Sequence, residues 1–218
     1  MNKITLISDT HTMHKGLENK FNLPPADYII HCGDITGLGT EHTTREFLKW
    51  FNNLSQYKHK IFIAGNHDWL FEISPALAKD IVEEYENVIY LEDSGVEINN
   101  IKFWGSPVTL PFNNWAFNRS EEKLKQHWEA IPDNIDVLIT HGPPYKIMDF
   151  GPYSKEYTGS RSLYNEVVDR IKPKIHCFGH IHNDYGIYDH ESGVKFINAS
   201  NLDESYKITN KPIVLNHF

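Results

Sequence analysis

The most constraining feature of this chain is a recurrence of polar clusters directly after short apolar, β-branched runs. One such run, Ile61-Phe62-Ile63-Ala64, leads into Gly65-Asn66-His67-Asp68. The run is typical of a buried strand, and in open α/β sheets ligands gather beyond the carboxyl ends of strands. The glycine permits a sharp turn, and the residues after it supply an amide oxygen, a nitrogen base and a carboxylate.

The same pattern occurs after four further apolar runs. The polar residues that follow these runs are Asp9 and His11, Asp34, His141, and His180 with His182. Taken alone, each residue has an ordinary explanation as a turn residue or a solvated histidine. Five clusters at one structural position argue against coincidence, and we expect these side chains to form one site.

Strands that alternate with helices predict a mainly parallel sheet and an α/β fold. The long strands are predicted over 3–8, 28–32, 60–64, 136–140 and 174–178, and the helices over 44–54, 74–85, 121–130 and 161–171. Shorter strands are predicted over 88–91, 95–98, 101–105, 185–189, 194–199 and 213–215, with a tight turn at Asn99-Asn100. Residues 15–26 are expected to be an irregular connection, and 107–118 and 143–160 to be long loops. No linker or repeat interrupts residues 1–218, which we expect to form a single domain.

Composition limits the classes of protein that the chain can belong to. Apolar residues make up 40% and charged residues 23% of the sequence, which is typical of a globular protein. The formal net charge of −8 argues against binding to extended nucleic acid, which requires clustered cations. Cys32 and Cys177 both lie in apolar runs and are interpreted as reduced core thiols. The chain begins without a signal-peptide pattern and has no apolar run long enough for a membrane span, so we expect a cytoplasmic location.

The donor set predicts a metal centre. Carboxylate and amide oxygens together with several imidazole nitrogens suit Mn²⁺, Fe, Zn²⁺ or Co²⁺ better than Ca²⁺ or a thiolate-bound ion. Seven side chains are too many for one ion with an open position, but they fit two ions that share a bridging carboxylate. Such a pair stabilises the attacking and leaving oxygens of an in-line phosphoryl displacement and lowers the pKa of a bridging water.

The order and form of these motifs resemble the calcineurin-like metallophosphoesterase superfamily over nearly the whole chain. The resemblance implies a two-sheet β-sandwich flanked by helices and two metal sites bridged by Asp34. The implied ligands are Asp9, His11 and His182 for one ion, and Asn66, His141 and His180 for the other. It also implies that His67 binds no metal but protonates the leaving oxygen or contacts the phosphate, and that Asp68 orients His67.

Two features narrow the position within the superfamily. Ile35-Thr36-Gly37-Leu38 follows Asp34, where protein Ser/Thr phosphatases carry a further Asp-Arg-Gly. Segments 103–107, 112–118, 140–144 and 197–200 resemble the metallophosphoesterase-domain (MPPED) proteins, which are similar to class III cyclic-nucleotide phosphodiesterases. Some vertebrate members have glycine at the position of His180. Because this chain keeps the histidine, we expect a competent site.

The expected function is hydrolysis of small phosphodiesters, with cyclic nucleotides as candidates, by in-line attack of a metal-bridging hydroxide. Manganese is the favoured ion of the four. One alternative is a phosphomonoesterase or a nuclease acting on nucleic-acid ends; another, of a different class, is a weakly active protein-binding scaffold. No extended nucleic acid or membrane is expected as a partner, and the oligomeric state is left open.

Candidate substrate contacts come from the residues near these motifs. They are His14, Trp104, Asn114 and Tyr145, with Phe112 and Trp115 as further walls of a base-stacking pocket and Lys146 and Arg161 as phosphate contacts. For each aromatic residue the alternative is core packing, and for each polar residue it is a solvated loop position.

Overall fold

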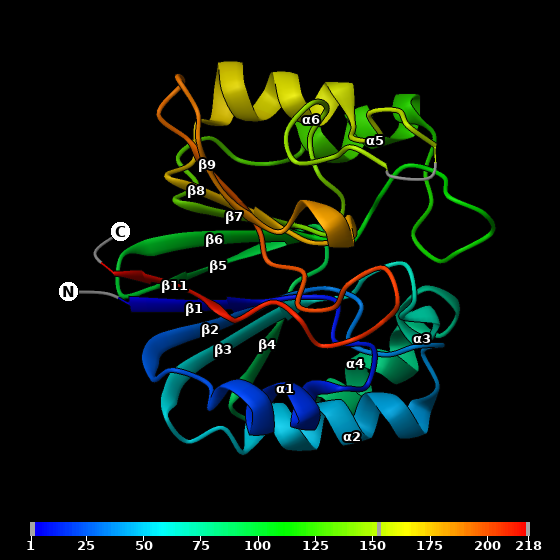
Figure 1. The fold of residues 1–218 in the computed structure, drawn as a ribbon, viewed down its shortest axis with the longest axis vertical. Coiled ribbons are helices and arrows are strands. Elements are labelled where there is room, and N and C mark those ends of the chain that lie inside the picture. The colour runs from blue at the N-terminus through cyan, green and yellow to red at the C-terminus, as the bar shows by residue number, and fades with distance from the viewer. Residues whose placement is uncertain (1–2, 152–153, 217–218) are drawn as a thin grey trace.

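The protein is described from a computed structural model, which covers residues 3–151 and 154–216. Two β-sheets pack face to face, and helices cover the outer face of each sheet (Figure 1). The first sheet has five strands in the order β11-β1-β2-β3-β4. These strands are β1 (Lys3–Ile7), β2 (Ala26–Cys32), β3 (Tyr57–Ile63), β4 (Val88–Tyr90) and β11 (Ile213–Asn216). Strands β1 to β4 are parallel to one another, and β11 runs antiparallel to β1.

The second sheet has six strands in the order β5-β6-β7-β8-β10-β9. They are β5 (Ser94–Ile98), β6 (Ile101–Ser106), β7 (Val137–Thr140), β8 (Ile175–Phe178), β9 (Gly186–Asp189) and β10 (Lys195–Asn198). The four central strands are parallel, and β5 and β9 pair antiparallel at the two edges. The turn between β5 and β6 is formed by Asn99 and Asn100, which both have positive φ, as the sequence predicts for a tight hairpin turn.

The helices form the two outer layers of the sandwich. Helices α1 (His14–Phe21), α2 (Glu41–Asn52), α3 (Trp69–Ile73) and α4 (Pro75–Glu83) lie on the side of the first sheet (Figure 1). Helices α5 (Glu121–Glu129) and α6 (Arg161–Asn165) cover the second sheet, and α6 continues as the π-helical segment η1 (Glu166–Ile171). A short 3₁₀ turn, η2 (His182–Asp184), follows β8.

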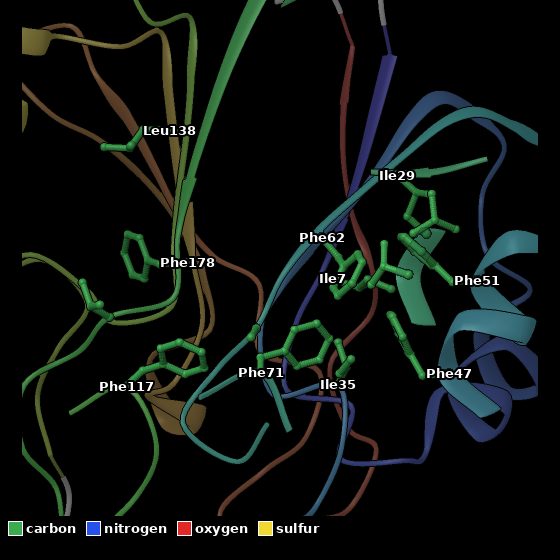
Figure 2. Packing of buried hydrophobic residues seen from close by; sticks show 14 of the residues in the cluster. Ile7, Ile29, Ile35, Phe47, Phe51, Phe62, Phe71, Phe117, Leu138 and Phe178 are labelled. Atoms are coloured by element: carbon green, nitrogen blue, oxygen red, sulfur yellow. The ribbon is translucent and has the colours of Figure 1, made fainter. Parts of the chain in front are cut away.

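Alternation along the strands divides the core into an inner and an outer part. Ile30 of β2 and Ile139 of β7 belong to the cluster that joins the two sheets, whereas their neighbours Ile29 and Leu138 belong to the cluster that reaches the helices (Figure 2). Side chains on a strand point alternately to opposite faces, so one apolar run can serve both layers. Because both faces of the central strands are covered, their ends are the positions where polar groups can meet solvent.

The two-sheet sandwich and the predicted long strands are confirmed, but the connection after the first strand is not irregular. Residues 14–21 form α1, in which Leu17 is buried and His14 packs against Phe47 and Trp50 of α2; the helix ends at Asn22 with a φ of 48°. The helix contains Gly16 and offers few apolar positions, so its periodicity is weak. Contacts with α2, among them a hydrogen bond from Trp50 Nε1 to Glu18 Oε2 at 2.7 Å, add support that the local sequence pattern does not record.

Both cysteines are free thiols buried in the core, as the sequence predicts. No helix in the part of the chain that the structure describes is both long and apolar enough to span a bilayer.

Candidate metal centre

The polar clusters meet at the carboxyl ends of strands from both sheets. Strands β1, β2 and β3 of the first sheet lead into Asp9, Asp34 and Asn66, and β7 and β8 of the second sheet lead into His141 and His180. Four of the predicted ligands have backbone conformations that L-residues seldom adopt, with φ of 52° at Asp9, 40° at His11, 54° at Asp34 and 70° at His180. The chain therefore turns abruptly where each strand ends, at some conformational cost, and such strain is common at functional sites.

The first predicted ligand group is assembled in the structure. Ligand atoms of Asp9, His11 and His182 all lie within 4.8 Å of one another, and His182 Nε2 is 3.5 Å from Asp9 Oδ1. Ser200 Oγ donates to Asp9 Oδ2 at 2.8 Å, and the backbone N–H of His180 donates to the same carboxylate. These donors hold the Asp9 carboxylate in one orientation.

The second predicted group is assembled around His141, which also lies within 4.8 Å of Asp34 and Asp9. His141 Nε2 is 2.9 Å from Asn66 Oδ1, and the His141 and His180 rings have centroids 5.0 Å apart. Asp34 Oδ2 is 3.4 Å from His141 Nε2 and 3.6 Å from His11 Nε2, so this one oxygen faces both groups. The other carboxylate oxygen of Asp34 accepts the backbone N–H of His67 at 2.8 Å.

Carbonyl oxygens fix the orientation of three histidine rings. The Nδ1 atom of His141 donates to Cys32 O at 3.0 Å, that of His182 to Asp203 O at 3.1 Å, and that of His67 to Gly37 O at 2.8 Å. A carbonyl can only accept, so Nδ1 carries the proton in each case and Nε2 is left available as a ligand or base.

Burial and mutual attraction oppose each other in the electrostatics of the site. Burial disfavours the charged form of both aspartates, but His182 holds the pKa of Asp9 below its ordinary value, and the charge of His141 holds that of Asp34 well below it. Burial also disfavours charged histidine, yet the neighbouring carboxylates raise the pKa of His141 and His182 to about 9. The site thus contains two buried carboxylates that require positive charge.

The surroundings of His11 show that these residues fit a metal ion. It is 7% exposed, and neither ring nitrogen has a hydrogen-bond partner among the described residues. Burial lowers its pKa to about 4, so the ring is neutral near pH 7. A buried neutral imidazole without partners beside two carboxylates is suited to metal ligation, and the mixed oxygen and nitrogen donors fit divalent transition ions.

His67 lies within reach of the same centre. Its ring is edge-on to His11, with centroids 4.5 Å apart, and stacks on Trp115 at 4.0 Å. One atom each of His11, Asp34 and His67 also lie within 4.8 Å of one another. Distance alone therefore does not separate a ligand role from the predicted acid role of His67.

The expected role of Asp68 requires correction, because its carboxylate bonds to Thr36, Ile35 and Gly65 rather than to the His67 ring. Oδ1 accepts from the N–H and hydroxyl of Thr36 at 2.9 and 2.7 Å, and Oδ2 accepts from the N–H of Ile35 and Gly65 at 3.1 and 2.8 Å. The group that orients His67 is Gly37 O. Asp68 joins the loop after β2 to the loop after β3, so its effect on His67 is indirect.

A cavity of about 340 Å³ opens over the centre. Besides the predicted site residues, it is lined by Leu110, Pro111 and Phe112 of the loop after β6, by Gly151, Ser154 and Thr158, by Ile181 and Asn183, and by Glu204 and Tyr206. Tyr206 was not predicted; its ring contacts that of His11, with centroids 4.9 Å apart. It comes from the irregular segment 199–210, which has no motif or periodicity that marks it.

The four candidate substrate contacts do not line this cavity. His14 is buried and packs against Phe47 and Trp50. Trp104 lies on β6 against the hydrophobic core, Asn114 is exposed in a turn, and Tyr145 lines a second cavity with Lys146 and Arg161. Of the base-stacking candidates, Phe112 lines the cavity, and Trp115 reaches the site by stacking on His67.

This architecture, with ligands from five strand ends between two sheets, is that of a metallophosphoesterase. A sequence model described as calcineurin-like phosphoesterase matches residues 2–184, and the chain belongs to this family of metal-dependent phosphoester hydrolases. It is similar to human metallophosphoesterase domain-containing protein 1, with 35% identity over 98% of this chain and 70% of the human protein. It is also similar to the UPF0046 protein K07C11.7 of Caenorhabditis elegans, with 33% identity over 97% of this chain and 74% of that protein.

Solved structures agree on the fold. The crystal structure of TT1561 from Thermus thermophilus superposes with a TM-score of 0.64 and 13% identity, covering 99% of this chain and 98% of that one. At this identity the likeness concerns the fold alone.

Proposed function

We propose that this chain hydrolyses small phosphodiesters, cyclic nucleotides among the candidates, with two divalent ions, manganese favoured, bound at the candidate metal centre. The observation that carries the proposal is the position of Asp34 Oδ2 between His11 Nε2 and His141 Nε2, at 3.6 and 3.4 Å. One carboxylate oxygen facing two ligand groups is the arrangement that a bridged pair of ions requires. Bound there, the two ions would supply positive charge to the phosphoryl oxygens and lower the pKa of water.

The remaining steps belong to the protein's own side chains. His11 and His182 flank Asp9 on one side, and Tyr206 stands against both rings. His67 keeps its Nδ1 proton on Gly37 O, so in the protonated form Nε2 carries the proton that can be delivered to the departing alkoxide. Trp115 stacks on His67 and fixes the plane of its ring.

The lining of the cavity favours a diester over a monoester. No lysine or arginine lines it among residues 3–151 and 154–216, and Glu204 adds a negative charge. A phosphodiester carries one negative charge, whereas a monoester carries up to two near neutral pH and requires more compensation from side chains. Leu110, Pro111 and Phe112 provide apolar surface for an organic ester group.

We also propose a cytoplasmic location, supported by two buried free thiols, and a small-molecule substrate rather than extended nucleic acid, supported by the net charge of −8.

The test compares hydrolysis of bis(p-nitrophenyl) phosphate and p-nitrophenyl phosphate with added Mn²⁺, for the wild type, His67→Ala and a control, His42→Ala. His42 is a surface histidine on α2, with its side chain 82% exposed. We expect a diester preference that chelation abolishes and a kcat roughly 10²–10⁴-fold lower in His67→Ala, with full metal content and no change in His42→Ala.

Other results would redirect the assignment. A preference for the monoester would favour a phosphatase, and turnover of neither ester by a metal-loaded protein would favour the scaffold. Loss of one ion per chain in His67→Ala would make His67 a ligand instead of an acid.

A further inference from the structure

A second cavity lies apart from the metal centre, between the loop 143–160, α6 and β9. It has a volume of about 530 Å³ and shares no lining residue with the cavity over the centre. The residues that define its chemistry are Tyr145, Lys146, Arg161, Tyr164, Tyr188 and His190. No carboxylate lines it among the described residues, although the chain carries a formal net charge of −8.

Arg161 is the main cation of this cavity. The other arginines are paired, Arg45 with Glu41 and Glu84, Arg119 with Glu72, and Arg170 with Glu166 and Asp133. No carboxylate pairs with Arg161 anywhere in residues 3–151 and 154–216. Its guanidinium lies over the Tyr145 ring, 3.7 Å from the centroid, which holds the group in place while its N–H donors remain available.

Lys146 brings a second cation to the same place. Its backbone has a φ of 61° and is held by a hydrogen bond from its N–H to Asp149 Oδ2 at 2.9 Å. Its ammonium group lies 5.5 Å from the Tyr145 centroid and 5.6 Å from that of Tyr157. The loop thus brings Lys146 to the cavity that Arg161 also lines, and both cations lie against the ring of Tyr145.

Polar side chains that line the cavity together with these cations can donate hydrogen bonds. His190 Nδ1 accepts the backbone N–H of Ser192 at 3.1 Å, so the neutral ring carries its proton on Nε2. Tyr164 and Tyr188, which carry phenolic hydroxyls, also line the cavity. Two cations that pair with no carboxylate among the described residues, together with several donors, favour an anion that offers several acceptor oxygens.

We propose that this second cavity binds a phosphate group, either inorganic phosphate or the phosphate of an organic monoester, separately from the metal centre. Bidentate recognition by guanidinium together with a point charge from lysine is suited to a dianionic phosphate. The proposal does not depend on which phosphoester the centre hydrolyses.

The first experiment counts phosphate ions bound to the manganese-loaded protein by equilibrium dialysis up to 10 mM phosphate. We expect Arg161→Gln to bind one phosphate fewer per chain than the wild type, and Lys146→Gln to raise the dissociation constant of that site at least tenfold. The matched control is Lys155→Gln, which removes an exposed lysine of the same loop that lines neither cavity. All three variants should keep kcat/KM for the diester within twofold.

The result that overturns the proposal is equal phosphate binding by the wild type and Arg161→Gln, including the case in which neither has a site beyond the metal centre. Phenyl phosphate distinguishes the two sources of the anion. Binding at least tenfold tighter than that of inorganic phosphate, lost in Tyr188→Ala, assigns the site to an organic monoester. Equal affinity assigns it to inorganic phosphate.

Discussion

Replacement of Gly65 by alanine is expected to damage the metal centre without altering any ligand. Gly65 is not among the described residues with positive φ, so the conformational freedom expected from the sequence is not the reason for glycine here. Space is the reason, because a Cβ would stand 2.3 Å from Asp34 Oδ1, 2.4 Å from Asp34 N and 2.7 Å from His141 Cε1. Ordinary contacts begin at 3.4 Å, so the gap must widen by about 1 Å.

The neighbours of Gly65 have little room to yield. Asp34 is 2% exposed and His141 is fully buried. Overpacking of this kind costs about 2–3 kcal/mol, which corresponds to a Tm lower by roughly 4–12 °C in a chain of this size. Displacement of Asp34 also separates the two ligand groups that its Oδ2 faces, so the metal content should fall from two ions per chain to one or none.

Gly37→Ala is the matched control, because no atom lies within 4 Å of the added Cβ. Metal content is measured by elemental analysis after dialysis, and Tm by calorimetry on the same samples. If Gly65→Ala retained two ions and had a Tm within 2 °C of that of Gly37→Ala, the explanation would be wrong: the close approach of Asp34 would not require a glycine at position 65.

Two further changes test other parts of the account. In Asp68→Asn the amide NH₂ faces a backbone donor in either orientation; when it faces Thr36, the hydroxyl can turn and accept, but the hydrogen bond from the Thr36 N–H is lost. Urea unfolding should show a loss of about 1.5–3 kcal/mol, and a loss below 1 kcal/mol would contradict the bracing role. His176 is buried, with Nε2 bonded to Thr140 Oγ1, and burial lowers its pKa from 6.5 to about 3, so the unfolded chain takes up a proton first and stability falls as pH drops below 6.5. His176→Leu should therefore reduce the slope of unfolding free energy against pH between pH 6 and 4.5 by about 1.4 kcal/mol per pH unit. An unchanged slope would show that His176 does not contribute to the loss of stability at low pH.

The position of the candidate centre could be predicted because its residues follow strands directly. In Ile61-Phe62-Ile63 the buried run marks the strand, and the polar residues after it must lie at the strand's end. The central parallel strands of each sheet end on the same side, so these separate clusters come together in space. The positions of Asp9 and Asp34 can therefore be predicted from where they stand in the sequence relative to the strands.

The rest of the site depends on contacts that no local pattern records. Tyr206 reaches His11 from the irregular segment 199–210, and Asp203 orients His182 through a backbone carbonyl, which any residue could supply. The hydrogen-bond partners of Asp68 are set by the approach of two loops. Because Asp68 directly follows His67 in the sequence, the sequence suggests a contact between them that the fold does not make. Tyr145 is close to His141 in sequence, but its loop folds back toward α6.

The candidate ligands are divided between the two layers of the sandwich. Asp9 and Asp34 extend from the first sheet, whereas His141 and His182 extend from the second. Ions held by both sets would act as a removable cross-link at one end of the interface between the sheets. Because ligands that bind only the folded state add to its stability in proportion to the logarithm of their concentration, the supply of metal would set how readily the two layers separate, and the cell could adjust the lifetime of the folded chain through the same ions that support its chemistry.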